Sequence, residues 1–138
     1  LLADALCGLG TTRTVIVTGT DGLDEVTLNG PTDVLMIENE DVSEFQWEPC
    51  DFGISDSSLE SLQVENAEQS ANVIGQVLAG EAGPHRDIVV MNAAAALWVA
   101  NPKLGLKDCA KMSAEAIDSG SAGEKLAQMR EWTATQKK

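Results

Sequence analysis

The sequence predicts an α/β fold in which a partial parallel sheet with an antiparallel β meander is followed by a C-terminal helical half. The β-branched run Arg13–Gly19 ends in glycine, and such runs are typical of buried strands in parallel sheets. Short apolar segments separated by turn residues continue up to Trp47, which favours a meander. After residue 63 the apolar residues recur at helical spacing, so the rest of the chain is expected to be helical.

The first half of the chain is expected to contain one helix and four short strands. Residues 1–9 should form the helix, because Leu2, Leu6 and Leu9 recur at helical spacing and Gly10 can end it. The strand at 13–19 follows, and after it comes a loop with several acidic residues. The expected strands of the meander are 26–28, 33–38 and 42–47, with turns at 29–31 and 39–41 between them.

Four helices are expected in the second half. The helix at 86–100 is apolar nearly all round, which is typical of a helix buried at the centre of a domain. Pro84 can form its first turn and Asn101 precedes the proline that ends it. The other expected helices are 64–78, ending near Gly80, 107–119, ending at Gly120, and 122–133, followed by the basic tail Lys137-Lys138.

The composition argues against several classes of function. The chain has 138 residues, with 9 Lys+Arg against 22 Asp+Glu, and a net charge of −13. This balance argues against nucleic acid and anionic membrane surfaces as partners. Its longest apolar stretch, 88–100, has about 13 residues, fewer than the roughly 18 that span a bilayer. We therefore expect a single domain, 1–138, in the cytoplasm, where Cys7, Cys50 and Cys109 are free thiols.

The chain begins at Leu1, inside a helical pattern and without a methionine. We expect it to be part of a longer protein. A parallel sheet that has lost its neighbouring strands exposes an apolar edge, here expected at Val15–Val17. The isolated chain is then expected to associate or to be marginally stable.

The acidic loop after the first strand is the candidate functional site. Ligands of open α/β sheets bind beyond the carboxyl ends of strands, and Asp21, Asp24 and Glu25 lie there. Carboxylates are suitable ligands for a hard divalent cation. Adjacent side chains of an extended segment point to opposite sides, so Asp24 and Glu25 share one ion only if the backbone is irregular. Otherwise they bind two different ions, or two water molecules in the coordination shell of one ion. The simpler alternative is an acidic turn that is exposed to water and binds no metal.

Other polar residues have structural interpretations. His85, beside Pro84, is expected at the surface or in a capping role. Asn92 lies among apolar residues, so its amide needs a hydrogen-bond partner if it is buried. None of the three cysteines has an evident base partner, which argues against a cysteine nucleophile.

Several segments together resemble one family. Val15–Thr27 contains a Gly-x-Asp-Gly-Leu-Asp-Glu motif, and Pro49–Ile54 contains Pro-x-Asp-Phe-Gly. The segments 77–84, 86–97 and 116–122 follow in the same order and spacing as in anthranilate phosphoribosyltransferases, which this chain resembles over essentially its whole length. The chain departs from the family pattern at Thr18, where histidine is usual, and at 62–64, where Gly-Gly-Asp is frequent.

The resemblance implies a fold and a reaction. These enzymes transfer a phosphoribosyl group from phosphoribosyl pyrophosphate (PRPP) to the amine of anthranilate, the second step of tryptophan biosynthesis from chorismate. Their fold is similar to that of the pyrimidine nucleoside phosphorylases, with a small helical domain and a large α/β domain. This chain resembles the C-terminal portion of the large domain and lacks the Gly-Thr-Gly-Gly-Asp pyrophosphate loop. It also lacks the helical domain, which forms the family's homodimer contact, so the isolated chain is expected to be inactive.

The resemblance also assigns the metal site. The Asp-Glu pair of the family's motif binds Mg²⁺ that bridges to the pyrophosphate, and Asp24 and Glu25 occupy those positions. No catalytic residue is identifiable in the chain itself. Two alternatives remain: a pyrimidine nucleoside phosphorylase-like enzyme of the same fold, and a non-catalytic interaction module.

Overall fold

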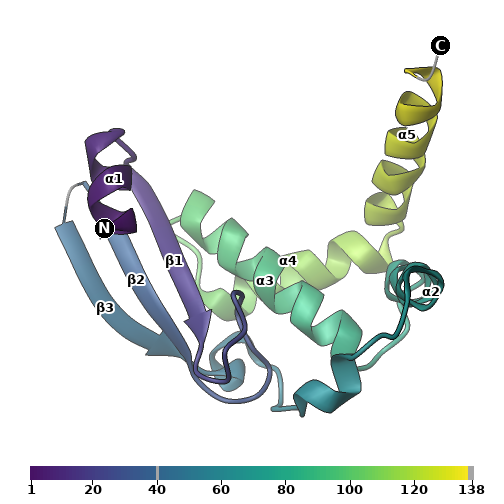
Figure 1. Cartoon of the computed structure of the whole chain (residues 1–138), viewed down its shortest axis with the longest axis horizontal. Coiled ribbons are helices and arrows are strands. Elements are labelled where there is room, and N and C mark those ends of the chain that lie inside the picture. Colours follow the sequence, from purple (N-terminus) through teal and green to yellow (C-terminus); the bar gives the residue numbers. More distant parts are fainter. Residues whose placement is uncertain (40, 137–138) are drawn as a thin grey trace.

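A computed structural model describes residues 1–39 and 41–136, with a sheet at one end and a group of helices at the other (Figure 1). The α/β order of elements is the predicted one, with a β meander first and helices after it. The elements are α1 (Leu2–Gly8), β1 (Arg13–Gly19), β2 (Thr32–Glu38), β3 (Asp41–Trp47), the 3₁₀ turns η1 (Pro49–Phe52) and η2 (Leu59–Leu62), α2 (Ala67–Leu78), α3 (Pro84–Ala100), α4 (Leu106–Asp118) and α5 (Ser121–Thr135).

The sheet has three strands in the order β1-β2-β3, and both pairs are antiparallel. Arg13 lies opposite Glu38 and Gly19 opposite Thr32, so β1 and β2 pair along their whole length. The sequence led us to expect parallel pairing for β1, and the described residues, 1–39 and 41–136, show none. Instead, β1 forms the first strand of the antiparallel meander. A β-branched run indicates a buried strand but does not encode the direction of its neighbour.

The predicted helices are all present, with slightly shifted ends. Pro84 stands in the first turn of α3, as expected, and Gly80 follows α2 with a φ of +85°. Within the described ranges, no helix combines the length and the apolar character needed to span a membrane. Glu40, in the expected turn at 39–41, and the basic tail at 137–138 lie outside the described residues.

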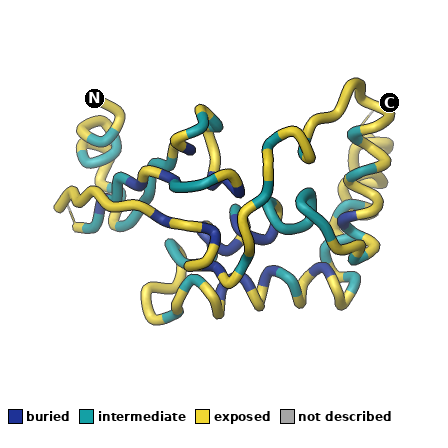
Figure 2. Tube along the Cα trace, turned by 90° about the horizontal axis from the view of Figure 1, so that it is seen from below, coloured by how far each residue is buried: buried dark blue, intermediate teal, exposed yellow. Residues whose placement is uncertain are grey.

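The core lies between the sheet and helices α3 and α4, and Figure 2 shows the buried segments gathered in the middle of the molecule. Leu28, Met91, Ala94 and Cys109 have no exposed surface. Cys109 is a free thiol, and Cys7 and Cys50 are free as well, in agreement with the sequence prediction. The apolar character of α3 is thus explained by its central position, because its side chains contact the sheet side and α4.

Arg13 joins the sheet to the C-terminal end of α3. Its Nη1 donates hydrogen bonds to the carbonyl oxygens of Trp98, at 2.6 Å, and Val99, at 3.1 Å. Its guanidinium lies 4.1 Å from the centre of the Trp98 ring, and its Nε is 3.3 Å from Oε1 of Glu38. Carbonyls at a helix C-terminus lack intrahelical donors, and a guanidinium satisfies them with favourable charge. This contact fixes the N-terminal end of β1, opposite to the end that carries the acidic loop, relative to the C-terminal end of α3.

Candidate functional site

The loop between β1 and β2, residues 20–31, is organised by Asp21. The carboxylate of Asp21 accepts hydrogen bonds from Oγ1 of Thr27, at 2.5 Å, and from the backbone N–H of Leu23, at 3.1 Å. Burial alone would raise the pKa of Asp21, but these hydrogen bonds favour the ionised form and lower the pKa below its usual value. Asp21 is therefore committed to the loop, and of the three acids considered from the sequence it is the one least available to a cation.

Gly19, at the end of β1, permits this arrangement. Its N–H donates to the carbonyl of Leu23 at 2.8 Å, which closes the turn. A Cβ at this position would lie 2.4 Å from Oδ1 of Asp21 and 3.1 Å from Cβ of Thr27. A side chain of any size thus conflicts with the hydrogen bonds of Asp21, and glycine is required here for space.

The segment 26–28, expected as a strand, is instead a buried stretch without regular secondary structure. The amide of Asn92 on α3 takes the place of a neighbouring strand, because its Oδ1 accepts from the N–H of Val26 and its Nδ2 donates to the carbonyl of Val26, both at 2.9 Å. Nδ2 also donates to the carbonyl of Ile88 at 3.0 Å. The prediction of a structural hydrogen bond for Asn92 is confirmed, and its partner is the loop that carries the acidic pair.

Asp24 and Glu25 precede this buried segment and are exposed. Their backbone belongs to neither a helix nor a strand, which is the irregular geometry that a shared ion requires. Neither carboxylate has a hydrogen bond or ion pair with any residue in the ranges 1–39 and 41–136. Partial burial, and then the neighbouring charge of Asp24, raise the pKa of Glu25. Two adjacent unpaired carboxylates, one of which raises the pKa of the other, are suited to bind a cation.

The chain supplies these two carboxylates and no complete metal cage. Over the part of the chain that the structure describes, no group of three or more His, Cys, Asp or Glu side chains is placed to hold a metal ion. Mg²⁺ is usually bound by one or two carboxylates, with waters and phosphate oxygens completing its octahedron. Asp24 and Glu25 therefore fit Mg²⁺ whose remaining ligands come from a substrate and from water.

A cavity of about 340 Å³ lies beside Glu25. The acidic loop, η2 and the first turns of α3 line it, it opens to solvent, and its walls are largely apolar. His85 lines this cavity, and its Nε2 is buried and without a hydrogen-bond partner within the described residues. Of the expected surface or capping role, the surface position agrees with the structure, because His85 is partly exposed where it lines this cavity, but its side chain makes no capping hydrogen bond there. The lining residues are Leu23, Glu25, Leu59, Leu62, Gln63, His85 and Ile88.

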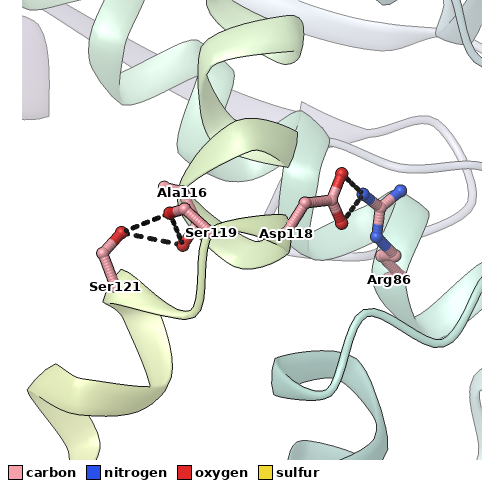
Figure 3. A network of polar contacts seen from close by, with 5 residues as sticks. All are labelled: Arg86, Ala116, Asp118, Ser119 and Ser121. Carbon is pink, nitrogen blue, oxygen red and sulfur yellow. Dashed lines mark hydrogen bonds and ion pairs between the residues drawn. The ribbon is translucent and has the colours of Figure 1, made fainter.

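The first turn of α3, which carries His85, is held against the end of α4 (Figure 3). Nη2 of Arg86 donates to both carboxylate oxygens of Asp118, at 2.8 and 3.0 Å. Figure 3 also shows Oγ of Ser121 donating to the carbonyl of Ala116, at 2.9 Å, at the junction of α4 and α5. The contact between Arg86 and Asp118 gives the His85 side of the cavity a defined position relative to α4.

The fold and the acidic loop define a class of protein. The family described as "Glycosyl transferase family, a/b domain" matches residues 1–123, and the chain belongs to this family. Among curated proteins, it is 41% identical to an anthranilate phosphoribosyltransferase of Thermoanaerobacter sp. over 131 residues, which are 95% of this chain and 39% of the relative. It is 43% identical to that of Chromobacterium violaceum over 121 residues, 88% of this chain and 35% of the relative. The chain thus spans less than half the length of these relatives.

Solved structures give the same family. Anthranilate phosphoribosyltransferase from Saccharomyces cerevisiae superposes with a TM-score of 0.82 and 28% identity, over 91% of this chain and 37% of the yeast chain. The yeast enzyme in complex with PRPP and Mg superposes with a TM-score of 0.77 and 30% identity, over 83% of this chain and 33% of that one. The α/β class and the recognised family are thereby confirmed.

The acidic pair Asp24 and Glu25 is evident from the sequence, but the cavity beside Glu25 is not. Asp24 and Glu25 are adjacent in the chain, so one motif reveals both. The cavity joins Glu25 to Leu59 and His85, which are far apart in the sequence. The available signal was Pro84, which places His85 in the first turn of a buried helix, although the sequence does not indicate what that turn faces.

Proposed function

We propose that this chain acts as part of an anthranilate phosphoribosyltransferase, in which Asp24 and Glu25 bind the Mg²⁺ that accompanies PRPP. The observation that carries the proposal is the pair of unpaired carboxylates on an irregular but firmly anchored loop. The relatives named above support the reaction, and the yeast complex with PRPP and Mg supports the metal. PRPP and anthranilate are accordingly the proposed substrates.

The reaction exchanges one bond at C1 of the ribose for another. The bond from C1 to the diphosphate oxygen breaks, and the electron pair leaves with the diphosphate. The amine nitrogen of anthranilate forms a bond to C1 and loses a proton. Mg²⁺, when bound, neutralises the negative charge that accumulates on the departing diphosphate.

The residues of this chain hold and position the acidic pair. Asp24 and Glu25 bind the cation through oxygen, and their negative charge is thereby balanced in a chain of net charge −13. Asp21 and Asn92 keep the loop in one conformation on both sides of the pair. This rigidity matters because a misplaced leaving group lowers the rate even when its binding is retained.

Replacement of the acidic pair tests the proposal. In the full-length protein, Asp24→Asn and Glu25→Gln should each lower kcat/KM for PRPP by roughly 10²- to 10³-fold, as expected when one charge-stabilising contact at a leaving group is lost. The concentration of Mg²⁺ needed for half-maximal rate should rise in both variants. Steady-state rates at several Mg²⁺ concentrations measure both effects.

A matched control is Glu115→Gln, which removes one exposed carboxylate from α4, away from the loop, and should leave both quantities unchanged. A double variant of Asp24 and Glu25 with the rate of the unchanged protein would reject the metal assignment. Product formed from a pyrimidine nucleoside and phosphate, but not from PRPP and anthranilate, would favour the phosphorylase alternative. The isolated chain is proposed to be inactive, and the proposed homodimer contact lies in the relatives' segment that this chain does not span.

A further inference from the structure

We propose that His85 is a binding residue of the same site, and that its Nε2–H donates a hydrogen bond to an oxygen of a metal-bound diphosphate group. The inference rests on the proposed function, which places a diphosphate beside Asp24 and Glu25. It adds a residue from α3 to the two that the loop supplies. His85 belongs to none of the sequence motifs that suggested the metal site.

The first argument is location. His85 and Glu25 line one cavity of about 340 Å³, although they come from different elements. This volume lies within the range of pockets that hold small ligands or ligand groups. Most of the wall is aliphatic, from residues such as Leu59, Leu62 and Ile88, so the few polar groups determine what binds. A group that binds a cation at Glu25 and extends into the cavity comes within reach of His85.

The second argument is the unsatisfied nitrogen. Nε2 of His85 is buried and has no hydrogen-bond partner among the described residues. Most buried polar side-chain atoms are paired, because an unpaired one loses its hydrogen bonds to water without replacement. The described part of the chain does not supply a partner, and rotation of the imidazole into the cavity that His85 lines would offer the Nε2–H to a ligand oxygen.

The third argument is charge. The chain carries a net charge of −13, and no lysine or arginine among residues 1–39 and 41–136 lines this cavity. A phosphate oxygen bound here needs a donor in addition to the cation, and an imidazole N–H provides one. Hydrogen bonds to charged oxygens are stronger than those between neutral groups. A diphosphate chelated by Mg²⁺ therefore matches the donor of His85 and the carboxylate of Glu25 together.

Calorimetric titration of the full-length protein with inorganic diphosphate in the presence of Mg²⁺ tests this assignment. His85→Leu keeps a side chain of similar size without a donor, and it should weaken diphosphate binding roughly 10- to 100-fold, as expected for one hydrogen bond to a charged group. His85→Gln can place an amide N–H near the position of Nε2, and it should bind within about threefold of the unchanged protein. Gln76→Leu is a matched control, because Gln76 lines a neighbouring cavity with His85 but not this one.

A second measurement separates this inference from the proposed function. Binding of Mn²⁺ alone, followed by electron paramagnetic resonance, should be unchanged in His85→Leu and weakened in Glu25→Gln. If His85→Leu binds Mg²⁺-diphosphate as well as the unchanged protein while Glu25→Gln does not, the role of His85 is rejected and the metal site is retained. If Glu25→Gln affects neither measurement, the metal site fails.

The conservative variant decides between binding and structure. If His85→Gln is as weak as His85→Leu, or if His85→Leu also loses Mn²⁺ or lowers the Tm, His85 has a structural role and the proposal is overturned. Restoration of diphosphate binding by His85→Gln, at unchanged Tm, supports it.

Discussion

The loop at 20–31 has an irregular backbone but contains a buried segment, whereas helix α5 has a regular backbone but is exposed. The loop has no helix or strand, yet Val26, Thr27 and Leu28 within it are at most 1% exposed. Helix α5 is fully regular, yet none of its residues is buried, and it extends away from the body of the molecule in Figure 1. Met129 and Trp132 on this helix are 64% and 65% exposed. Regular backbone is therefore a poor guide to which part of this chain is fixed in place.

The difference lies in where the backbone hydrogen bonds go. Helix α5 satisfies its own N–H and C=O groups within one segment, so it needs few contacts with the rest of the chain. The loop cannot do this and relies on side chains from inside and outside itself, among them Asp21, Thr32 and Asn92. Each of these contacts is specific, so single substitutions should disturb the loop far more than α5.

The largest effect is expected for Asn92→Leu. The substitution keeps the helix and the side-chain volume but leaves the N–H and C=O of Val26 buried and unpaired. Loss of two such partners should lower the free energy of unfolding by about 3 kcal/mol. Denaturant unfolding measures it, with Asn101→Leu as an exposed control that should cost far less. A loss for Asn92→Leu no greater than that of the control would show that the loop is held by other contacts.

The same chemical change in the two regions should have opposite signs. Gly19→Ala places a Cβ 2.4 Å from Oδ1 of Asp21, and the forced shift should cost about 1–3 kcal/mol of unfolding free energy. Gly123→Ala, in the first turn of α5, meets no atom within 4 Å and replaces a poor helix former, so it should stabilise by up to about 0.5 kcal/mol. Parallel denaturant unfolding curves give both values. Equal effects at the two positions would contradict the comparison.

The contrast also explains how far the sequence predicted the structure. The helices and the strands at 33–38 and 42–47 were predicted because a repeating apolar face reports on local backbone. The segment 26–28 was predicted wrongly as a strand, since Val-Thr-Leu has a strand composition but its actual partner is Asn92, which is 66 residues away. A one-dimensional pattern contains no information on such a distant side chain.

The candidate site likewise combines residues that the sequence could predict with residues that it could not. Asp24 and Glu25 could be predicted because both acids and the strand before them belong to one short segment. The position of His85 could not, because the cavity is formed only when α3 and η2 meet the loop. Asp21 could be grouped with the other acids from the sequence, but only the hydrogen bond from Thr27 distinguishes its structural role.

Asp21→Asn should have a smaller effect that depends on pH. The pKa of Asp21 is lowered in the folded chain, so its carboxylate stabilises the fold above its ordinary pKa, and this contribution is lost as the pH falls through the folded pKa. At pH 7 the variant should lose about 1–2 kcal/mol, because hydrogen bonds to a charged acceptor become bonds to a neutral one. Unfolding curves between pH 7 and pH 3 should then converge for the two proteins. A loss that stays constant down to pH 3 would mean that the charge of Asp21 is not what stabilises the loop.

The smallest effect is expected for Trp132→Ala in α5. Removal of a buried tryptophan costs several kcal/mol, but Trp132 is 65% exposed on a helix without buried residues, so the loss should be below about 0.5 kcal/mol. Denaturant unfolding at two protein concentrations measures it, with Met129→Ala as a second exposed position on the same helix. A loss above about 1 kcal/mol that grows with protein concentration would mean that α5 packs against another molecule. In that case the position of α5, like that of the loop, would depend on contacts from outside its own segment.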